Sequence, residues 1–360
     1  MLTQLVPKFF LSVLSLALVI PPAEVAAWAQ DKGKDKDKQA PQQQQPEQAP
    51  GFAISVTVPV VSVDVVVTDN NGNFLTGLKK ENFRITEDNT VQSISNFAPS
   101  DAPITIVLLV EFSKLGYYIF TYNAVNWASA FLGNLKQNDW VALETFNMRS
   151  HVEVDFTHNR NEILGGLSSL YFPPFSESNL FDALSDVLDR IKDVKGKKSV
   201  LVLASGIDTF SRLTLDKTMQ RVRETDATIF TVGVGEQLFL WAEANNPGGG
   251  GFGQQLNFLQ AENQLKTFAA MTGGRAWFPR FDGEIPSIMQ EVATSLRNQY
   301  SMAYTPTNST LDGKYRKIKV ELVAPDGGPL TVLDQKGKKV KFQVYARQGY
   351  TAPKSNVEGN

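Results

Sequence analysis

Acidic and hydroxyl side chains follow two strongly apolar segments of this chain. Glu111 and Ser113 come directly after the apolar run at 104–110, and Ser205 comes after the run at 199–203. Apolar runs without polar alternation are typical of central parallel strands covered on both faces, and such strands carry their ligand sites at their carboxyl ends. We therefore predict that Glu111, Ser113 and Ser205 lie where the chemistry of this protein takes place.

Nucleophilic catalysis is the first chemistry that these residues suggest. Ser205 follows a buried strand as an esterase nucleophile would, but its context A-S-G-I lacks the flanking glycines of G-x-S-x-G. The two histidines, His151 and His158, fall near the ends of an expected edge strand, away from the carboxyl edge of the sheet. No G-x-G-x-x-G or G-K-[ST] loop follows a strand. The sequence thus predicts a protein that is not an enzyme, with a hydrolase using Ser205 or Glu111 as an alternative.

Residues 103–299 alternate between strand and helix patterns, which predicts a doubly wound parallel sheet in an α/β domain. Apolar runs predict the strands, and 3.6-residue periodicity predicts the helices. Expected strands are 104–110, 140–146, 199–203, 228–234 and 276–278, with an edge hairpin at 151–156. Expected helices are 118–135, 161–170, 180–194, 215–225, 256–271 and 285–298.

Both flanks of this region are rich in β-strand signals. Residues 52–98 show apolar alternation at every second position, and residues 300–353 do so again, with turn signals such as Asp312-Gly313 and Lys336-Gly337. A small sheet needs a partner layer to bury its apolar face. We therefore predict that the two flanks form one β-sandwich, into which the α/β domain is inserted.

The amino terminus has the pattern of an export signal. An apolar run at 9–20 ends in Pro21 and Pro22 and is followed by A-W-A, which predicts a signal peptide over 1–29 cleaved after Ala29. Residues 30–51 combine alternating lysine and aspartate with glutamine and proline, which predicts a disordered linker, and residues 354–360 are expected to be a disordered tail. The protein is thus expected to be secreted or periplasmic, with no membrane insertion after cleavage.

Composition excludes several functions. The chain of 360 residues has a net charge of −2, which gives no electrostatic footprint for nucleic acid or anionic lipid. It contains no cysteine, which excludes disulfides and thiol nucleophiles. The hydrophobic content of 42% supports a large core.

Three separated segments resemble the von Willebrand factor A-related proteins that occur as secreted bacterial proteins, of the type abundant in acidobacteria. The first is T-D-N-N-G at 68–72 with E-N-F at 81–83 and T-E-D at 86–88, and the second is S-N-L-F-D-A-L at 178–184. The third combines Y-T-P-T-N at 304–308, D-G-K-Y-R-K-I at 312–318 and A-R-Q-G-Y at 346–350. Their order and spacing extend the resemblance over about residues 52–353.

The resemblance implies a metal-ion-dependent adhesion site that has degenerated. It places Glu111 at the family's first aspartate, Ser113 at its first serine and Ser178 at its threonine, whereas Leu115 and Ser205 stand where a serine and an aspartate would bind the metal. Asp208 is close enough in sequence to contribute, although an acid in such a loop is usually solvated. We expect Mg²⁺ or Mn²⁺ binding to be weak or lost. The alternative role for Ser113 and Ser178 is to cap the following helices.

The function implied by the resemblance is binding of a protein partner, in adhesion or complex assembly. The stretch 237–255 contains N-P-G-G-G-G-F-G and is predicted to be a flexible insertion. Its apolar side chains are candidate partner contacts: Phe239, Leu240, Trp241 and Phe252. The alternative is a metal-independent scaffold whose contacts lie on the sandwich or on this insertion.

Overall fold

The structure, a computed structural model, describes residues 60–99, 102–114, 123–173, 175–245, 251–333 and 337–354. The predicted signal peptide and linker, Leu115 and residues 355–360 of the predicted tail lie outside the described residues. The chain divides into two units, Met1–Ser55 and Val56–Asn360, and the fold given below is that of the second unit. None of the helices in the described part combines the length and the apolar character that crossing a membrane requires.

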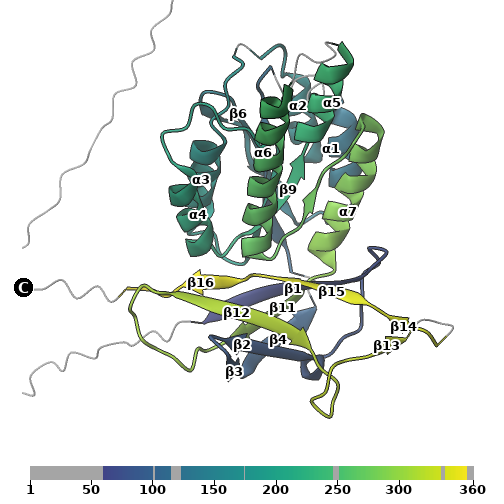
Figure 1. Ribbon diagram of the computed structural model, residues 1–360, viewed down its shortest axis with the longest axis vertical. Coiled ribbons are helices and arrows are strands. Elements are labelled where there is room, and N and C mark those ends of the chain that lie inside the picture. Colours follow the sequence, from purple (N-terminus) through teal and green to yellow (C-terminus); the bar gives the residue numbers. More distant parts are fainter. Residues whose placement is uncertain are drawn as a thin grey trace, which may run out of the picture. The chain divides into compact units, whose positions relative to one another are not determined.

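A six-stranded sheet forms the centre of the α/β region (Figure 1). Its strands are β5 (Ile104–Glu111), β6 (Trp140–Phe146), β7 (Ser150–Thr157), β8 (Lys197–Ala204), β9 (Thr228–Gly233) and β10 (Ala276–Trp277). The described helices are α1 (Ala124–Leu132), α2 (Arg160–Ser168), α3 (Leu180–Ile191), α4 (Leu215–Glu224), α5 (Gly235–Asn245), α6 (Gly251–Thr272) and α7 (Ile285–Arg297).

Strand order in this sheet is β10-β9-β8-β5-β6-β7. All neighbours are parallel except β7, which pairs antiparallel with β6 at the edge. Strands β5 and β8 lie side by side at the centre, and every residue of β8 after Lys197 is buried. Their carboxyl ends therefore meet at one edge of the sheet, which places Glu111 and Ser205 on neighbouring strand ends.

Two apolar cores cover the two faces of the sheet. Trp127 and Phe131 of α1 pack with Met289 of α7 on one face. Leu184 of α3 packs with Phe268 of α6 on the other. A parallel sheet with helices on both faces is the predicted doubly wound fold, and the fold class is confirmed.

The flanking segments form two antiparallel four-stranded sheets, as predicted. One has the order β15-β1-β11-β4 and the other β16-β12-β2-β3. These strands are β1 (Val61–Asp69), β2 (Phe83–Glu87), β3 (Thr90–Gln92), β4 (Ile94–Pro99), β11 (Tyr300–Tyr304), β12 (Tyr315–Leu322), β15 (Phe342–Ala346) and β16 (Gly349–Thr351). A short hairpin of β13 (Val332–Leu333) and β14 (Lys339–Val340) and 3-10 turns at Lys80–Asn82 and Asp282–Glu284 complete the described elements.

Segments far apart in the sequence pair in both sandwich sheets. Strand β1 pairs with β11, with Val65 opposite Tyr300, and β2 pairs with β12, with Ile85 opposite Val320. The valines at 61, 63, 65 and 67 are all buried, which gives β1 the inward face that its alternating pattern predicts. The chain thus leaves the sandwich after β4, builds the α/β domain, and returns to it with β11.

Residues from the first and third segments that carried the family resemblance form one buried polar network in the sandwich. Glu87, which is 2% exposed, accepts hydrogen bonds from the hydroxyls of Tyr304 at 2.7 Å and Tyr350 at 3.0 Å. Its other carboxylate oxygen lies 3.5 Å from Nη1 of Arg316. Burial, together with the nearby Glu87 charge, raises the pKa of Tyr350 to about 12, so this hydroxyl remains a donor at neutral pH. These motif residues therefore hold the sandwich together.

The predicted flexible insertion at 237–255 is largely helical, which corrects that prediction. Helix α5 extends to Asn245, and α6 begins at Gly251 and runs for 22 residues. Residues 246–250 lie outside the described part. Helix α6 forms despite the glycine-rich stretch because its later turns bury Leu265 and Phe268 against the sheet.

Candidate functional site

Three of the predicted site residues form one hydrogen-bonded cluster at the carboxyl edge of the sheet. The hydroxyl of Ser113 donates to Oε1 of Glu111 at 2.6 Å. Ser205 donates to Oε2 of Glu111 twice, from its backbone N–H at 2.6 Å and from its hydroxyl at 2.7 Å. All three residues are at most 1% exposed. Both carboxyl oxygens of Glu111 are thus occupied by the protein's own donors.

The environment of Glu111 acts on its ionisation in two directions. Burial raises its pKa, and the hydrogen bonds from Ser113 and Ser205 oppose that rise without cancelling it. The folded protein therefore keeps a proton at pH values where the unfolded chain, with a pKa near 4.5, has released it. The free energy of unfolding consequently falls as the pH rises from 4.5 toward the folded pKa.

Replacing Glu111 with glutamine should remove this pH dependence. Glutamine keeps an oxygen acceptor for Ser205 but cannot ionise, so the E111Q variant is expected to gain stability relative to the wild type as the pH rises above about 4.5. Urea unfolding at a series of pH values measures the difference. The exposed Glu81→Gln variant is the control and should run parallel to the wild type. Parallel curves for E111Q as well would contradict the raised pKa.

Ser178 lies in the loop that precedes α3, and its backbone is attached to the loop that follows β8. Its carbonyl accepts from the backbone N–H groups of Thr209 at 2.8 Å and Phe210 at 3.0 Å. Its hydroxyl oxygen is buried and has no hydrogen-bond partner among the described residues. The N-cap of α3 is Asn179, whose side chain makes no capping bond. The alternative that Ser178 caps this helix is therefore wrong, and Ser113, whose hydroxyl donates to Glu111, is engaged elsewhere as well.

Asp208 caps α3 in place of Ser178. Its Oδ1 accepts from the backbone N–H of Phe181 at 3.2 Å and from the hydroxyl of Ser211 at 2.5 Å. Burial raises the pKa of Asp208 above its usual range. The prediction that an acid in this loop is simply solvated is wrong, because the loop folds back onto the amino end of α3.

These residues do not fit a magnesium ion well. A metal would have to displace Ser113 or Ser205 from the carboxyl group at the centre of the cluster, and Mg²⁺ exchanges its water reluctantly for weaker ligands. Among the described residues, no group of three or more His, Cys, Asp or Glu side chains is arranged to hold a metal ion. Of the predicted ligands in the described part, Ser178 has the one buried side-chain oxygen without a hydrogen bond.

The histidines are not near Ser205. His151 lies near the start of the edge strand β7 and pairs with Thr145 at the end of β6, three strands away from β8 in the sheet order. It thus lies at the carboxyl edge, contrary to the prediction, but far from the serine. His158 lies at the other end of β7, where the centre of its ring is 3.7 Å from that of Trp140. Ser205 donates to Glu111 instead, so the geometry gives it no activating base of the esterase type.

Exposed aromatic side chains lie on two loops near the carboxyl edge of the sheet. The loop between α2 and α3 carries Tyr171, Phe172 and Phe175, which are 79%, 77% and 43% exposed, and Phe210 in the loop after β8 is 48% exposed. The N–H of Lys114, which follows the Glu111 strand, donates to the carbonyl of Phe175 at 2.9 Å. We call these four aromatic side chains the aromatic rim. The sequence signal that could have indicated them is L-Y-F-P-P-F at 170–175.

Of the apolar residues predicted to contact a partner, Leu240 on α5 is 47% exposed. The backbones of Phe239 and Trp241 also belong to α5, and that of Phe252 belongs to α6. The side chains of these three aromatic residues lie outside the described part.

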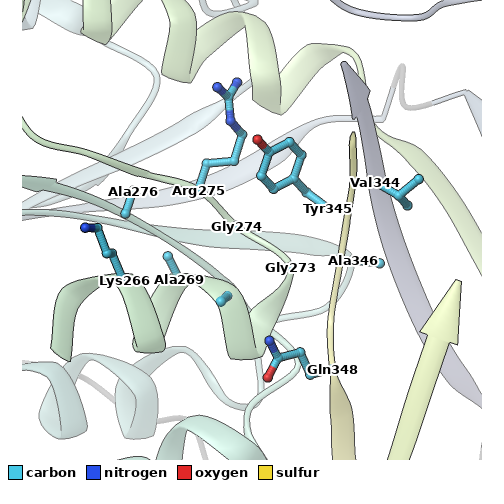
Figure 2. Close-up of a pocket in the computed structure, with 11 residues that line it drawn as sticks. Lys266, Ala269, Gly273, Gly274, Arg275, Ala276, Val344, Tyr345, Ala346 and Gln348 are labelled. Atoms are coloured by element: carbon cyan, nitrogen blue, oxygen red, sulfur yellow. The ribbon is translucent and has the colours of Figure 1, made fainter. Parts of the chain in front are cut away.

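A separate cavity, of about 320 Å³, lies between the end of α6 and β15 (Figure 2). Figure 2 shows Arg275 beside the ring of Tyr345, and the guanidinium lies 5.0 Å from the centre of that ring. Arg275 also pairs with Glu291 at 2.7 Å, and Lys266 pairs with Glu262. Because both cations at this cavity have carboxylate partners, we interpret the cavity as a packed junction of helix and strand.

The sheet is doubly wound with one antiparallel edge strand, and it carries polar side chains at its carboxyl edge, which is where α/β folds of this type place their ligand sites. Residues 105–266 match the family model of the von Willebrand factor type A domain, and this part of the chain is such a domain, abbreviated VWA below. Among curated proteins, no sequence matches the chain.

Several solved structures resemble this one. The von Willebrand factor type A protein from Catenulispora acidiphila aligns with 82% of this chain and 75% of its own, at 9% identity and a TM-score of 0.42. The vWF domain of the type V pili tip protein Mfa5 from Porphyromonas gingivalis aligns with 54% and 95%, at 10% identity and a TM-score of 0.39. Proximal thread matrix protein 1 from the mussel byssus aligns with 55% of this chain, at 12% identity and a TM-score of 0.42. The alignment covers 49% of the length of that protein.

Proposed function

We propose that this protein is an extracytoplasmic binding module, in adhesion or complex assembly, whose VWA domain engages a protein partner through the loops at the carboxyl edge of its sheet. VWA domains are generally interaction modules and not enzymes. The observation that carries the proposal is the aromatic rim, because large exposed aromatic side chains grouped in two adjoining loops are typical of a protein-binding surface. The extracytoplasmic location rests on the leader sequence.

The proposed binding does not depend on a metal ion. Hydrogen bonds from Ser113 and Ser205 to Glu111, in place of a metal ion, join the strand ends at the carboxyl edge of the sheet. The side chains of the aromatic rim contact the partner. We therefore expect the melting temperature to be the same, within about 1 °C, in millimolar MgCl₂ or MnCl₂ and in EDTA, since a ligand that binds only the folded state raises the midpoint. A clear rise with either metal would contradict a metal-independent edge.

Capture of envelope and extracellular proteins of the source cells tests the binding surface. The Y171S/F172S double variant changes only exposed side chains, so it should keep the wild-type melting temperature and lose the partner. The matched control is Val91→Ser, an exposed apolar residue on β3 of the sandwich. Loss of the partner with V91S but not with the double variant would favour the alternative of a scaffold that binds through its sandwich. Loss of capture in EDTA would show that a metal is needed.

A further inference from the structure

A cavity of about 480 Å³ opens beside the Glu111 cluster, between the loop after β8 and helix α6. Its apolar lining includes Phe181 of α3, Leu215 of α4 and Phe258 of α6. Gly206 allows the loop to lie this close to α6: its φ is +81°, and a Cβ added there would meet the carbonyl oxygen of Ala261 at 2.9 Å. The volume suits a single side chain or a small ligand.

The polar lining of this cavity includes residues with hydrogen-bond acceptors. Asp208 is the one ionisable residue among its described lining residues, so the charge that the lining can carry is negative. Asn257, Gln260 and Gln264 also line the cavity from α6, at the i, i+3 and i+7 spacing that places them on one helix face. Oε1 of Gln264 is buried without a hydrogen-bond partner in the described chain.

We propose that this cavity binds an arginine side chain of the protein partner. This inference rests on the proposed function, and it specifies the chemistry by which the partner is recognised. A guanidinium carries five N–H donors in one plane and no acceptor, so it can donate to the Asp208 carboxylate and to Gln264 Oε1 together. The methylene stem of the arginine would pack on Phe181, Leu215 and Phe258. The cavity thus supplies acceptors for the charged end and an apolar wall for the rest.

Other ligand types leave a group unsatisfied. An anion would lie against Asp208 with no cation in the described lining to offset the repulsion. A purely apolar side chain would give Gln264 Oε1 no donor and would cover the Asp208 carboxylate without pairing it. In this proposal the acid lies on this protein and the cation on the partner.

Titration of the full mature protein with N-acetyl-arginine-N-methylamide, followed by NMR or calorimetry, tests the site without any knowledge of the partner. N-acetyl-citrulline-N-methylamide has the same shape without the charge. Its affinity should be lower than that of the arginine compound by a factor of about ten at least. The D208N variant keeps an Oδ1 acceptor for the amino end of α3 but loses the charge, so it should weaken arginine binding by a similar factor. Asp193→Asn, an exposed acid between α3 and β8, is the matched control and should bind like the wild type.

A second variant keeps the test valid if D208N is poorly folded. Gln264→Leu removes the buried acceptor with little change in volume and should also weaken arginine binding. Equal affinity for the arginine and citrulline compounds, undiminished binding in both variants, or no binding to the wild type would overturn the proposal. This test and the test of the proposed function can give different results. A partner can be captured through the aromatic rim although the arginine compound does not bind, and the arginine compound can bind although no partner is captured.

Discussion

Replacing Arg316 with methionine is expected to lower the free energy of unfolding by about 3–5 kcal/mol, because it leaves the carboxylate of Glu87 buried without its cationic partner. The side chains of Arg316 and Glu87 are 4% and 2% exposed. Arg316 also donates to the carbonyl of Thr310 at 2.5 Å and to that of Asn308, so its loss releases the loop between β11 and β12 as well. Urea unfolding followed by circular dichroism measures the change.

Two further variants show whether the buried charge is the cause. Lys319→Met removes an exposed cation from the same strand, where Lys319 forms a surface pair with Glu321, and should cost no more than about 1 kcal/mol. The double variant E87Q/R316M leaves no charge at these two positions and keeps an acceptor for Tyr304 and Tyr350, so it should regain part of the lost stability. If the double variant is less stable than R316M alone, the loss does not arise from the unpaired carboxylate.

Apolar patterns predicted most of the fold because burial decides where the strands lie. The predicted strand at 140–146 has the same bounds as β6, and the run after Lys198 lies within β8. The prediction for 237–255 was wrong for the described parts, 237–245 and 251–255, because the glycines of this stretch oppose helix locally, whereas packing of the later turns stabilises α6. Local propensity is a weak guide where tertiary contacts act on the same segment.

At the candidate site, the sequence indicated the residues but not their partners. Glu111 and Ser205 each follow an apolar run in the sequence, which predicted that both lie at strand ends. They are neighbours because β5 and β8 pair in parallel, with Val110 opposite Leu203. The cap of α3 by Asp208 joins residues 27 positions apart, and nothing in the local pattern distinguishes it from a cap by Ser178. Three of the four residues of the aromatic rim lie in the segment L-Y-F-P-P-F, which was not predicted to contact a partner, because only the structure distinguishes exposed from buried aromatic side chains.

The second large effect is expected at Gly273, where α6 ends against the sandwich. Gly273 has a φ of +84°, and a Cβ added there would lie 2.6 Å from the backbone nitrogen of Arg347 and 2.8 Å from the carbonyl carbon of Ala346. Those residues belong to the point where the chain passes from β15 to β16. A hydrogen bond from Gln348 N to the carbonyl of Met271 at 3.2 Å joins this point to α6, and one from Arg347 to the carbonyl of Thr225 at 2.9 Å joins it to the end of α4.

Gly273→Ala is therefore expected to combine two penalties. The left-handed backbone costs a residue with a Cβ about 1–2 kcal/mol. The clash with backbone atoms, which cannot rotate away as a side chain can, adds about 1–3 kcal/mol. Gly196→Ala is the matched control, because Gly196 has the same φ of +84° with no atom within 4 Å of an added Cβ.

The difference between the two variants in urea unfolding isolates the packing of α6 on the sandwich from backbone strain. G196A should lose only the strain term of about 1–2 kcal/mol, whereas G273A should lose clearly more. Because Arg347 and Tyr350 belong to the same motif, A-R-Q-G-Y, a large loss in G273A would mean that this segment serves two contacts. It would hold the Glu87 network on one side and the end of α6 on the other. Equal losses in the two variants would show that the sandwich accommodates the added methyl group and that this contact is loose.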